Sequence, residues 1–178
     1  IKLFALNENN KILLEKQIFV DDFSLDKNFK TLDEFLNQNI FYFEKKLNNH
    51  LKEINLIVNY DDFISVDVST THNFNNNSNH FNNISNFLTN IKENVIMNMN
   101  GDNLIHMIIN KFIIDGKEYS SIQNDIDYNN IFLEIRFIFL KSQIILNLEK
   151  IFSKYEILIK NISSYKYVSN FKTSNADN

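Results

Sequence analysis

The sequence predicts an α+β fold, in which helices and strands mix along 178 residues. Residues 31–51 repeat apolar side chains at intervals of three and four, which indicates one face of a helix. Residues 63–72 alternate apolar and polar side chains, as a half-buried strand does. The most apolar run, residues 131–140, contains Glu134 and Arg136 and is far shorter than the roughly 20 residues of a membrane-spanning helix. The length suffices for one domain, or two small ones, with a real core.

The first third of the chain predicts a hairpin, a helix and a strand. Residues 2–20 form two strands around a polar turn at residues 7–10, with partly buried Leu3, Ala5, Leu13, Ile18 and Val20. The helix over 31–51 begins with Thr31 and Glu34, which fit a capping box. Its inward stripe is Leu32, Phe35, Leu36, Ile40, Phe43, Leu47 and Leu51. A buried strand follows at 54–60.

The rest of the chain continues this mixture. After the strand at 63–72, the Asn-rich residues 73–83 predict an exposed loop. A helix over 84–99 then places Ile84, Phe87, Leu88, Ile91 and Val95 inward. Two strands, 103–114 and 130–140, are joined by a turn that starts at Asp115-Gly116 and a loop that ends at residue 128. A helix over 143–155 has Ser142 as its cap and a stripe of Ile145, Leu148, Phe152 and Tyr155. A last strand is expected at 157–162.

Composition excludes several classes of protein. The formal net charge of -4 and the pI of about 5.6 argue against a nucleic-acid partner, because such domains carry a basic face. The absence of cysteine excludes a disulfide scaffold and thiolate metal sites. The chain starts with Ile1 and shows no basic-then-apolar leader, so we expect a fragment of a longer protein.

The histidines are the first candidates for chemistry. They are His50, His72, His80 and His106. His50 lies near a helix end, where a cation suits the dipole. A metal site of His72, His80 and a carboxylate is conceivable, but the spacing fits no helical or hairpin ligand pair. His106 lies among apolar neighbours in a strand pattern and is predicted to be a core or sheet-edge residue.

The acidic pairs and glycines give no catalytic motif. Asp21-Asp22, Asp61-Asp62 and Asp125/Asp127 lie where turns are expected, and turn-favouring aspartate is the simpler interpretation of them. Gly101 and Gly116 stand alone, so there is no Gly-rich phosphate loop. Lys45-Lys46 belong to the polar side of the first helix. We therefore expect no catalytic, cofactor-binding or metal-binding residue within this chain.

The segment 104–171 resembles FtsA, the bacterial actin-like ATPase that links the FtsZ ring to the membrane. In "HMIINKFIIDG", five residues follow the family pattern: His106, Phe112, Ile114, Asp115 and Gly116. Ile109 stands where the family has proline. Further on, Asn124 and Leu133-Glu134 agree with the family pattern, while Asp125 stands in place of a second proline.

The resemblance implies a partial actin-like (ribonuclease H-like) subdomain with an inserted strand-helix-strand-strand domain. Residues 1–61 are the first part of the subdomain, 62–141 are the insert with the Asn-rich loop 73–83, and 142–178 return to the subdomain and end in a cut or disordered tail. In a complete family member, the phosphate loops for ATP and its divalent metal precede Ile1 and follow Asn178. No ATP contact is therefore carried over to this chain.

The resemblance also implies a role. The family uses the insert for self-association into filaments and for contact with other division proteins, whereas FtsZ and the membrane bind regions further downstream. The complete protein is expected at the cytoplasmic, inner face of the cell membrane. Two alternatives stay open: an actin-like pilus-assembly protein, which would lack the C-terminal amphipathic membrane helix, and a small free-standing enzyme or ligand-binding domain with a pocket joining His106 and Asp115.

Overall fold

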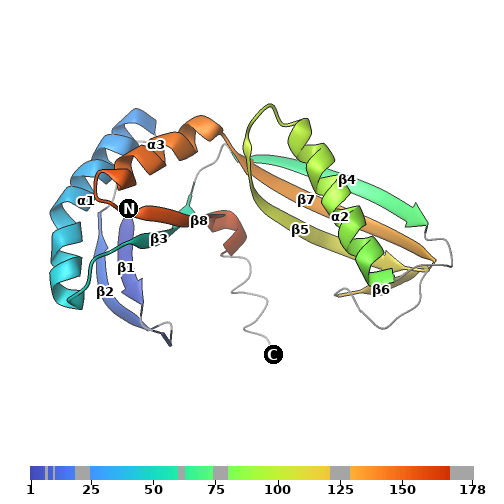
Figure 1. Cartoon of the computed structure of the whole chain (residues 1–178), viewed down its shortest axis with the longest axis horizontal. Helices are drawn as coiled ribbons and strands as arrows, with labels where there is room; N and C mark the ends of the chain where they lie inside the picture. Colours follow the sequence, from blue (N-terminus) through green and yellow to red (C-terminus); the bar gives the residue numbers. More distant parts are fainter. Residues whose placement is uncertain are drawn as a thin grey trace. The chain divides into compact units, whose positions relative to one another are not determined.

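The computed structural model describes residues 1–6, 8–9, 11–18, 25–59, 63–73, 80–120 and 129–168 (Figure 1). The strands are β1 Lys2–Leu6, β2 Ile12–Gln17, β3 Glu53–Val58, β4 Ile64–Asn73, β5 Asn103–Ile114, β6 Lys117–Tyr119, β7 Asn130–Leu140 and β8 Leu158–Ser164. The longer helices are α1 Leu25–Leu47, α2 His80–Met97 and α3 Ser142–Ser153. The predicted mixed α+β class is confirmed, and strands form three separate sheets, ordered β1-β2, β3-β8 and β4-β7-β5-β6.

The chain divides into two compact units. Unit 1 consists of Ile1–Leu56 and Gln143–Ile162, and unit 2 consists of Ile57–Ser142 and Ser163–Asn178. The long segment of unit 2 therefore interrupts unit 1 in the sequence. Each unit has its own buried apolar cluster or clusters, which are described separately below.

Unit 1 is organised by α1, whose apolar stripe meets two groups of partners. One group is buried around Leu36 and Ile40 and includes Ile151, Phe152 and Ile157 from α3 and the residues after it. The other is buried around Phe35 and Phe43 and includes Leu3 of the β1–β2 hairpin. All seven predicted stripe residues belong to these clusters, although Leu51 lies beyond the end of α1. The apolar spacing thus identified the buried face of the helix correctly.

The start of α1 corrects a prediction. The helix begins at Leu25, so Thr31 and Glu34 lie inside it and do not form a capping box at its start.

At the C-terminal end of α1, Asn48 has a positive φ of 50°, which ends the helix. The Glu44 carboxylate accepts the Leu51 amide at 3.1 Å and lies 3.2 Å from His50 Nδ1. His50 therefore contacts a side chain near this helix end, and Lys45 and Lys46 are exposed as predicted.

The hairpin of unit 1 has a different buried face from the predicted one. Leu3 and Ala5 pack inward as expected, but Leu14 joins them, whereas Leu13 and Ile18 are exposed. Leu14 is the register partner of Ala5 and shares its side, and the register then shifts so that Leu13 is passed over between Leu14 and Ile12. A single irregularity of this kind is invisible to a period-two pattern. Val20 lies outside the described residues.

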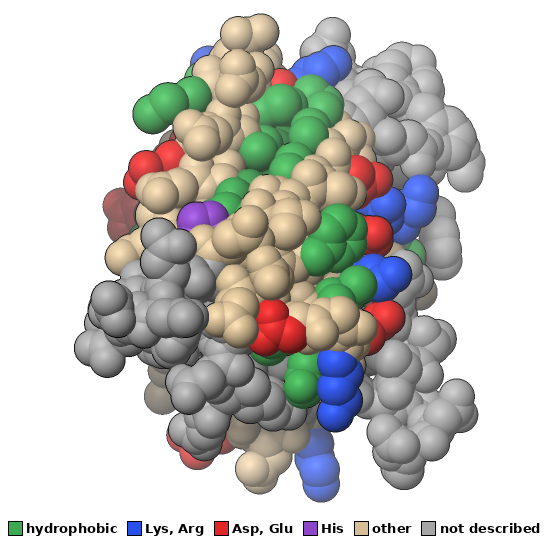
Figure 2. Space-filling model, turned by 90° about the vertical axis from the view of Figure 1, so that its right-hand side faces the viewer, with side chains coloured by type: hydrophobic (Ala, Val, Ile, Leu, Met, Phe, Trp, Pro, Cys, Tyr) green, Lys and Arg blue, Asp and Glu red, His purple; other side chains and the backbone are tan. Residues whose placement is uncertain are grey.

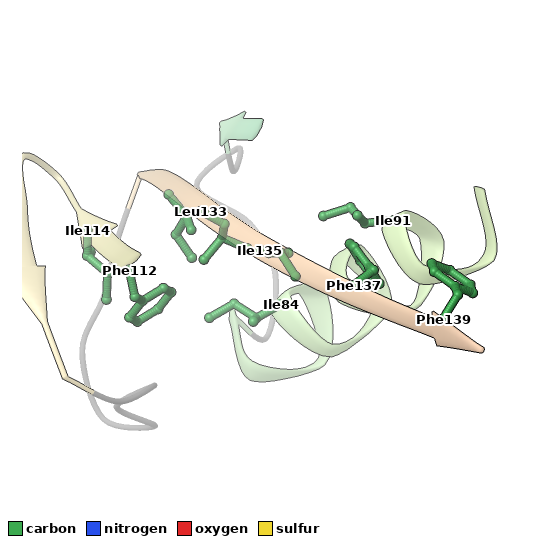
Figure 3. Close-up of a cluster of buried hydrophobic side chains, with 9 residues drawn as sticks. Ile84, Ile91, Phe112, Ile114, Leu133, Ile135, Phe137 and Phe139 are labelled. Atoms are coloured by element: carbon green, nitrogen blue, oxygen red, sulfur yellow. The ribbon is translucent and has the colours of Figure 1, made fainter. Parts of the chain in front are cut away.

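Unit 2 is a four-stranded antiparallel sheet with α2 on one face. Every second residue of β7 points toward α2, and Figure 3 shows Leu133, Ile135 and Phe137 on the same side as the helix residues Ile84 and Ile91. The cluster consists of Ile84, Ile91, Phe112, Ile114, Ile131, Leu133, Ile135, Phe137 and Phe139. All five inward residues predicted for α2 are buried or packed against this cluster. The predicted order of strand, helix, strand and strand is confirmed, with the three-residue β6 added.

Asp115 and Gly116 form the two-residue turn between β5 and β6. Ile114 pairs with Lys117 across it, and both turn residues have positive φ, 45° and 83°. Two positive φ values are typical of a type I′ turn, for which Asp-Gly is a favoured sequence. The predicted loop over 117–128 is therefore wrong at its start, because residues 117–119 are a strand. Asp115 accepts the amides of Asn130 at 2.8 Å and Asn129 at 3.1 Å, as the prediction of a capping role requires.

Replacing Asp115 with Ala is expected to lower the free energy of unfolding by about 1–2 kcal/mol, because two backbone amides lose a charged acceptor and Ala disfavours positive φ. Asp115→Asn keeps one acceptor oxygen and tolerates the left-handed region, so its loss should be smaller. Urea unfolding followed by circular dichroism measures both. Equal stability of Asp115→Ala and the wild type would contradict the capping role.

Two further predictions need correction. The Asn-rich loop is shorter than 73–83, because Asn73 ends β4 and α2 already starts at His80, and residues 74–79 lie outside the described part.

The predicted cap Ser142 is the first residue of α3. Its hydroxyl donates to the Gly101 carbonyl and accepts from Asn103 Nδ2 at 2.8 Å. These hydrogen bonds of Ser142 stay within unit 2 and do not cap the helix. The buried residues of α3 are Ile144, Leu148, Ile151 and Phe152.

Candidate functional site

The sheet of unit 2 has a second face, opposite the one that α2 covers, which we call the open face. Register partners in an antiparallel sheet share a face, so its members follow from the strand pairing. They are Ser65, Asp67, Ser69 and Thr71 on β4, Phe132, Glu134, Arg136 and Ile138 on β7, and His106, Ile108, Lys111 and Ile113 on β5. The β4 side chains and Arg136 are exposed, and the others are half-buried. The open face thus mixes apolar and charged side chains, and Glu134 and Arg136 lie in the middle of its central strand β7.

Arg136, the only arginine of the chain, forms a bidentate ion pair on the open face. Its Nε lies 2.7 Å from Asp67 Oδ1, and its Nη2 lies 2.9 Å from Asp67 Oδ2. The two residues are direct partners in the β4–β7 register. The hydrogen bond from Arg136 lowers the pKa of Asp67, and the pKa of Arg136 is raised in turn. The planar geometry fixes both side chains across the two strands.

His106 is contacted by the last residue of β8, Ser164, and by Tyr167, which follows that strand. Its Nε2 lies 3.0 Å from the Ser164 backbone nitrogen, which donates to it, and its ring lies 4.6 Å from the Tyr167 ring between centroids. Burial lowers the pKa of His106. An Nε2 that accepts a hydrogen bond carries no proton, so the imidazole is neutral with the proton on Nδ1. The prediction of an architectural histidine in the sheet agrees with this geometry.

The stability of unit 2 should fall with acidification because of His106. Its pKa is lower in the folded state than the ordinary 6.5, so the unfolded state binds the proton more readily. The contribution is fully present above about pH 6.5 and is lost as the pH falls through the folded pKa. Unfolding free energies at pH 7.5 and 5.0 should therefore differ more in the wild type than in His106→Gln. An identical pH dependence in the two proteins would contradict this.

His106 and Asp115 are not brought together. They lie at opposite ends of β5, nine residues apart, which corresponds to about 30 Å along a strand. The hydrogen bonds found for each side chain go to backbone amides of the same unit. The alternative of a small enzyme whose pocket joins these two residues thus loses its basis.

The other candidate residues do not assemble into a metal site. His72 stacks on Phe87 with ring centroids 4.5 Å apart, and the side chain of His80 is not described. Within the described ranges, no group of three His, Asp or Glu side chains could hold a metal ion. Asp21-Asp22, Asp61-Asp62 and Asp125/Asp127 lie outside those ranges. Among the helices that are described, none is long and apolar enough to cross a membrane.

In unit 1, Asp33, Lys154 and Tyr155 form a cluster of ionisable groups. Lys154 Nζ lies 2.5 Å from Asp33 Oδ2, and the Tyr155 hydroxyl donates to Asp33 Oδ1 at 3.0 Å. The hydrogen bond from Lys154 lowers the pKa of Asp33, while burial and the bond to Asp33 raise the pKa of Tyr155 to about 12. Both partners lie just after α3, and Asp33 lies on α1. The cluster therefore clamps the end of α3 to α1.

Sequence reasoning missed both the Asp67–Arg136 ion pair and the contact of Asp33 with Lys154. Asp67 and Arg136 both occupy polar positions of alternating strands, so a known pairing of β4 with β7 would have indicated the contact. Asp33 is 121 residues from Lys154 along the chain, and no local pattern links them. Figure 2 shows hydrophobic side chains beside acidic and basic ones on one face of the molecule.

No protein-family model matches the chain, and no curated protein matches it.

Proposed function

We propose that the chain is part of an FtsA-like cell-division protein, in which unit 2 serves self-association and contact with other division proteins. The order of the two units along the chain carries this assignment. The segment Ile57–Ser142 interrupts unit 1, as the inserted domain of such a protein interrupts its actin-like subdomain. The motif "HMIINKFIIDG" covers β5 from His106 to the turn at Asp115-Gly116.

The side chains of unit 2 favour a contact role over catalysis. Asp115 and His106 bind backbone amides, and Asp67 and Arg136 bind each other, so these groups stabilise the sheet. The open face mixes apolar residues, such as Phe132 and Ile108, with the charged Arg136. A non-obligate protein interface is about as apolar as the rest of a protein surface, so such a mixture suits a contact role.

ATP binding and membrane attachment belong to other parts of the complete protein in this proposal. By the resemblance, both phosphate loops, the FtsZ-binding region and the membrane helix lie outside residues 1–178. The complete protein would act at the inner face of the cell membrane, and no step of ATP hydrolysis is assigned to a residue here.

A bacterial two-hybrid assay tests the contact role. The chain is paired with itself and with the division proteins of its source organism, and Phe137→Ala, which disrupts the core of unit 2, serves as the negative control. We expect interaction with a second copy or with a division protein, and loss of it in the control. A well-expressed chain that interacts with neither would contradict the proposal.

A further inference from the structure

The two edges of the unit 2 sheet differ sharply. At one edge lies β6, which has three residues, two of them charged, Lys117 and Glu118. Short and charged edge strands resist pairing with another chain. At the other edge lies β4, which has ten residues and pairs with β7 on one side only within the described chain. Every second N–H and C=O of β4 therefore points away from the sheet.

The described residues of β4 itself carry none of the usual protections of an edge strand. Its sequence "ISVDVSTTHN" contains no proline or lysine, and its register with β7 runs without a shift from Ile64 to Asn73. A bulge, a proline or an unpaired charge is what normally prevents an edge strand from extending its sheet. The one carboxylate, Asp67, is held by Arg136. Among the described strands, β4 has β7 as its single neighbour.

We infer that β4 pairs with β4 of a second copy, antiparallel and centred on Val68. A two-fold axis perpendicular to the sheet makes such an interface self-complementary. This register pairs nine residues of β4, and it sets Asp67 opposite Ser69 and Ser65 opposite Thr71 of the second copy. A register centred on Asp67 would place two carboxylates opposite each other, which is destabilising.

The second copy is the occupant that the strand itself favours. In the proposed register, Val68 lies opposite Val68 of the second copy and Val66 lies opposite Thr70, so the middle of the side that packs against the core of unit 2 stays apolar or uncharged. On the open face, the Asp67–Arg136 pair of each copy meets an uncharged serine. The inference deepens the proposed self-association and rests on that proposed function for its role in the cell.

Disulfide trapping tests the register, because the chain has no cysteine of its own. In the dimer, Ser65 and Thr71 of opposite copies would be 4.5–5.5 Å apart between Cα atoms, roughly the spacing of a disulfide. Two copies of the same residue would lie six positions apart, about 20 Å. The double variant S65C/T71C should therefore give at least about tenfold more disulfide-linked dimer under mild oxidation than either single variant.

A mixture of S65C and T71C provides a second readout and should cross-link as well. The full chain is used throughout, and sedimentation velocity of the wild type at about 50 µM shows whether it associates, which a Kd near 10 µM would make evident. Single variants that cross-link as readily as the double variant overturn the inference. If the wild type associates but the cysteine variants do not cross-link, the pairing through β4 is overturned and the proposed self-association stands. If the wild type is a monomer and the variants do not cross-link, both are overturned.

Discussion

Replacing Phe43 with Ala is expected to lower the free energy of unfolding of unit 1 by about 3–5 kcal/mol. The side chain is 1% exposed and lies in the cluster that joins α1 to the β1–β2 hairpin through Leu3. Removing the ring deletes a large buried apolar area and leaves a cavity between helix and hairpin. Urea unfolding followed by circular dichroism measures the loss.

Phe41 provides the matched control on the same helix. It lies two residues earlier and is 73% exposed, so Phe41→Ala should change the stability by no more than about 0.5 kcal/mol. Equal losses in the two variants would show that the face of α1 assigned to the core is wrong.

Phe137→Ala should have an effect of similar size in unit 2, again about 3–5 kcal/mol. Phe137 is 0% exposed at the middle of β7, among the residues that face α2 (Figure 3). Its neighbours Leu133 and Ile135 belong to the same strand. Because β4 and β5 hold that strand on both sides, these two side chains cannot move in to fill the space. Amide hydrogen exchange of β7 should rise in this variant while exchange of α1 is monitored in the same sample.

Phe132 is the corresponding control, because it is a phenylalanine of the same strand on the open face. It is half-buried, so Phe132→Ala should cost clearly less than Phe137→Ala. A larger loss in Phe132→Ala would mean that the open face, and not the face under α2, is the main core of unit 2.

The element order could be predicted from the sequence because helical and strand periods are local properties. The stripe of α1 and the inward residues of α2 were confirmed residue by residue, and the bounds of β5 and β7 agree with the expected ones. The failures lie at ends and turns. A chain with no proline and two glycines has few residues that mark the ends of helices, and the predicted start of the first helix lies six residues after the observed one.

The contacts of the candidate site could be predicted only in part. Asp115 was expected to cap amides because Asp-Gly is a turn sequence, and its bonds to Asn129 and Asn130 fit that expectation. The strand β6 was missed because three residues are too few to show a period. The Asp67–Arg136 pair depends on a strand pairing between residues 69 positions apart, which no single-sequence pattern specifies.

The assignment to an FtsA-like protein is tested most directly by a chimera. Residues 1–178 replace the corresponding segment of FtsA in a cultured bacterium depleted of its own copy, and a protein lacking that segment serves as the control. The account predicts that the chimera reaches the FtsZ ring, interacts with itself and restores division. Filamentous cells in which the chimera is abundant and folded but behaves like the deletion would contradict it.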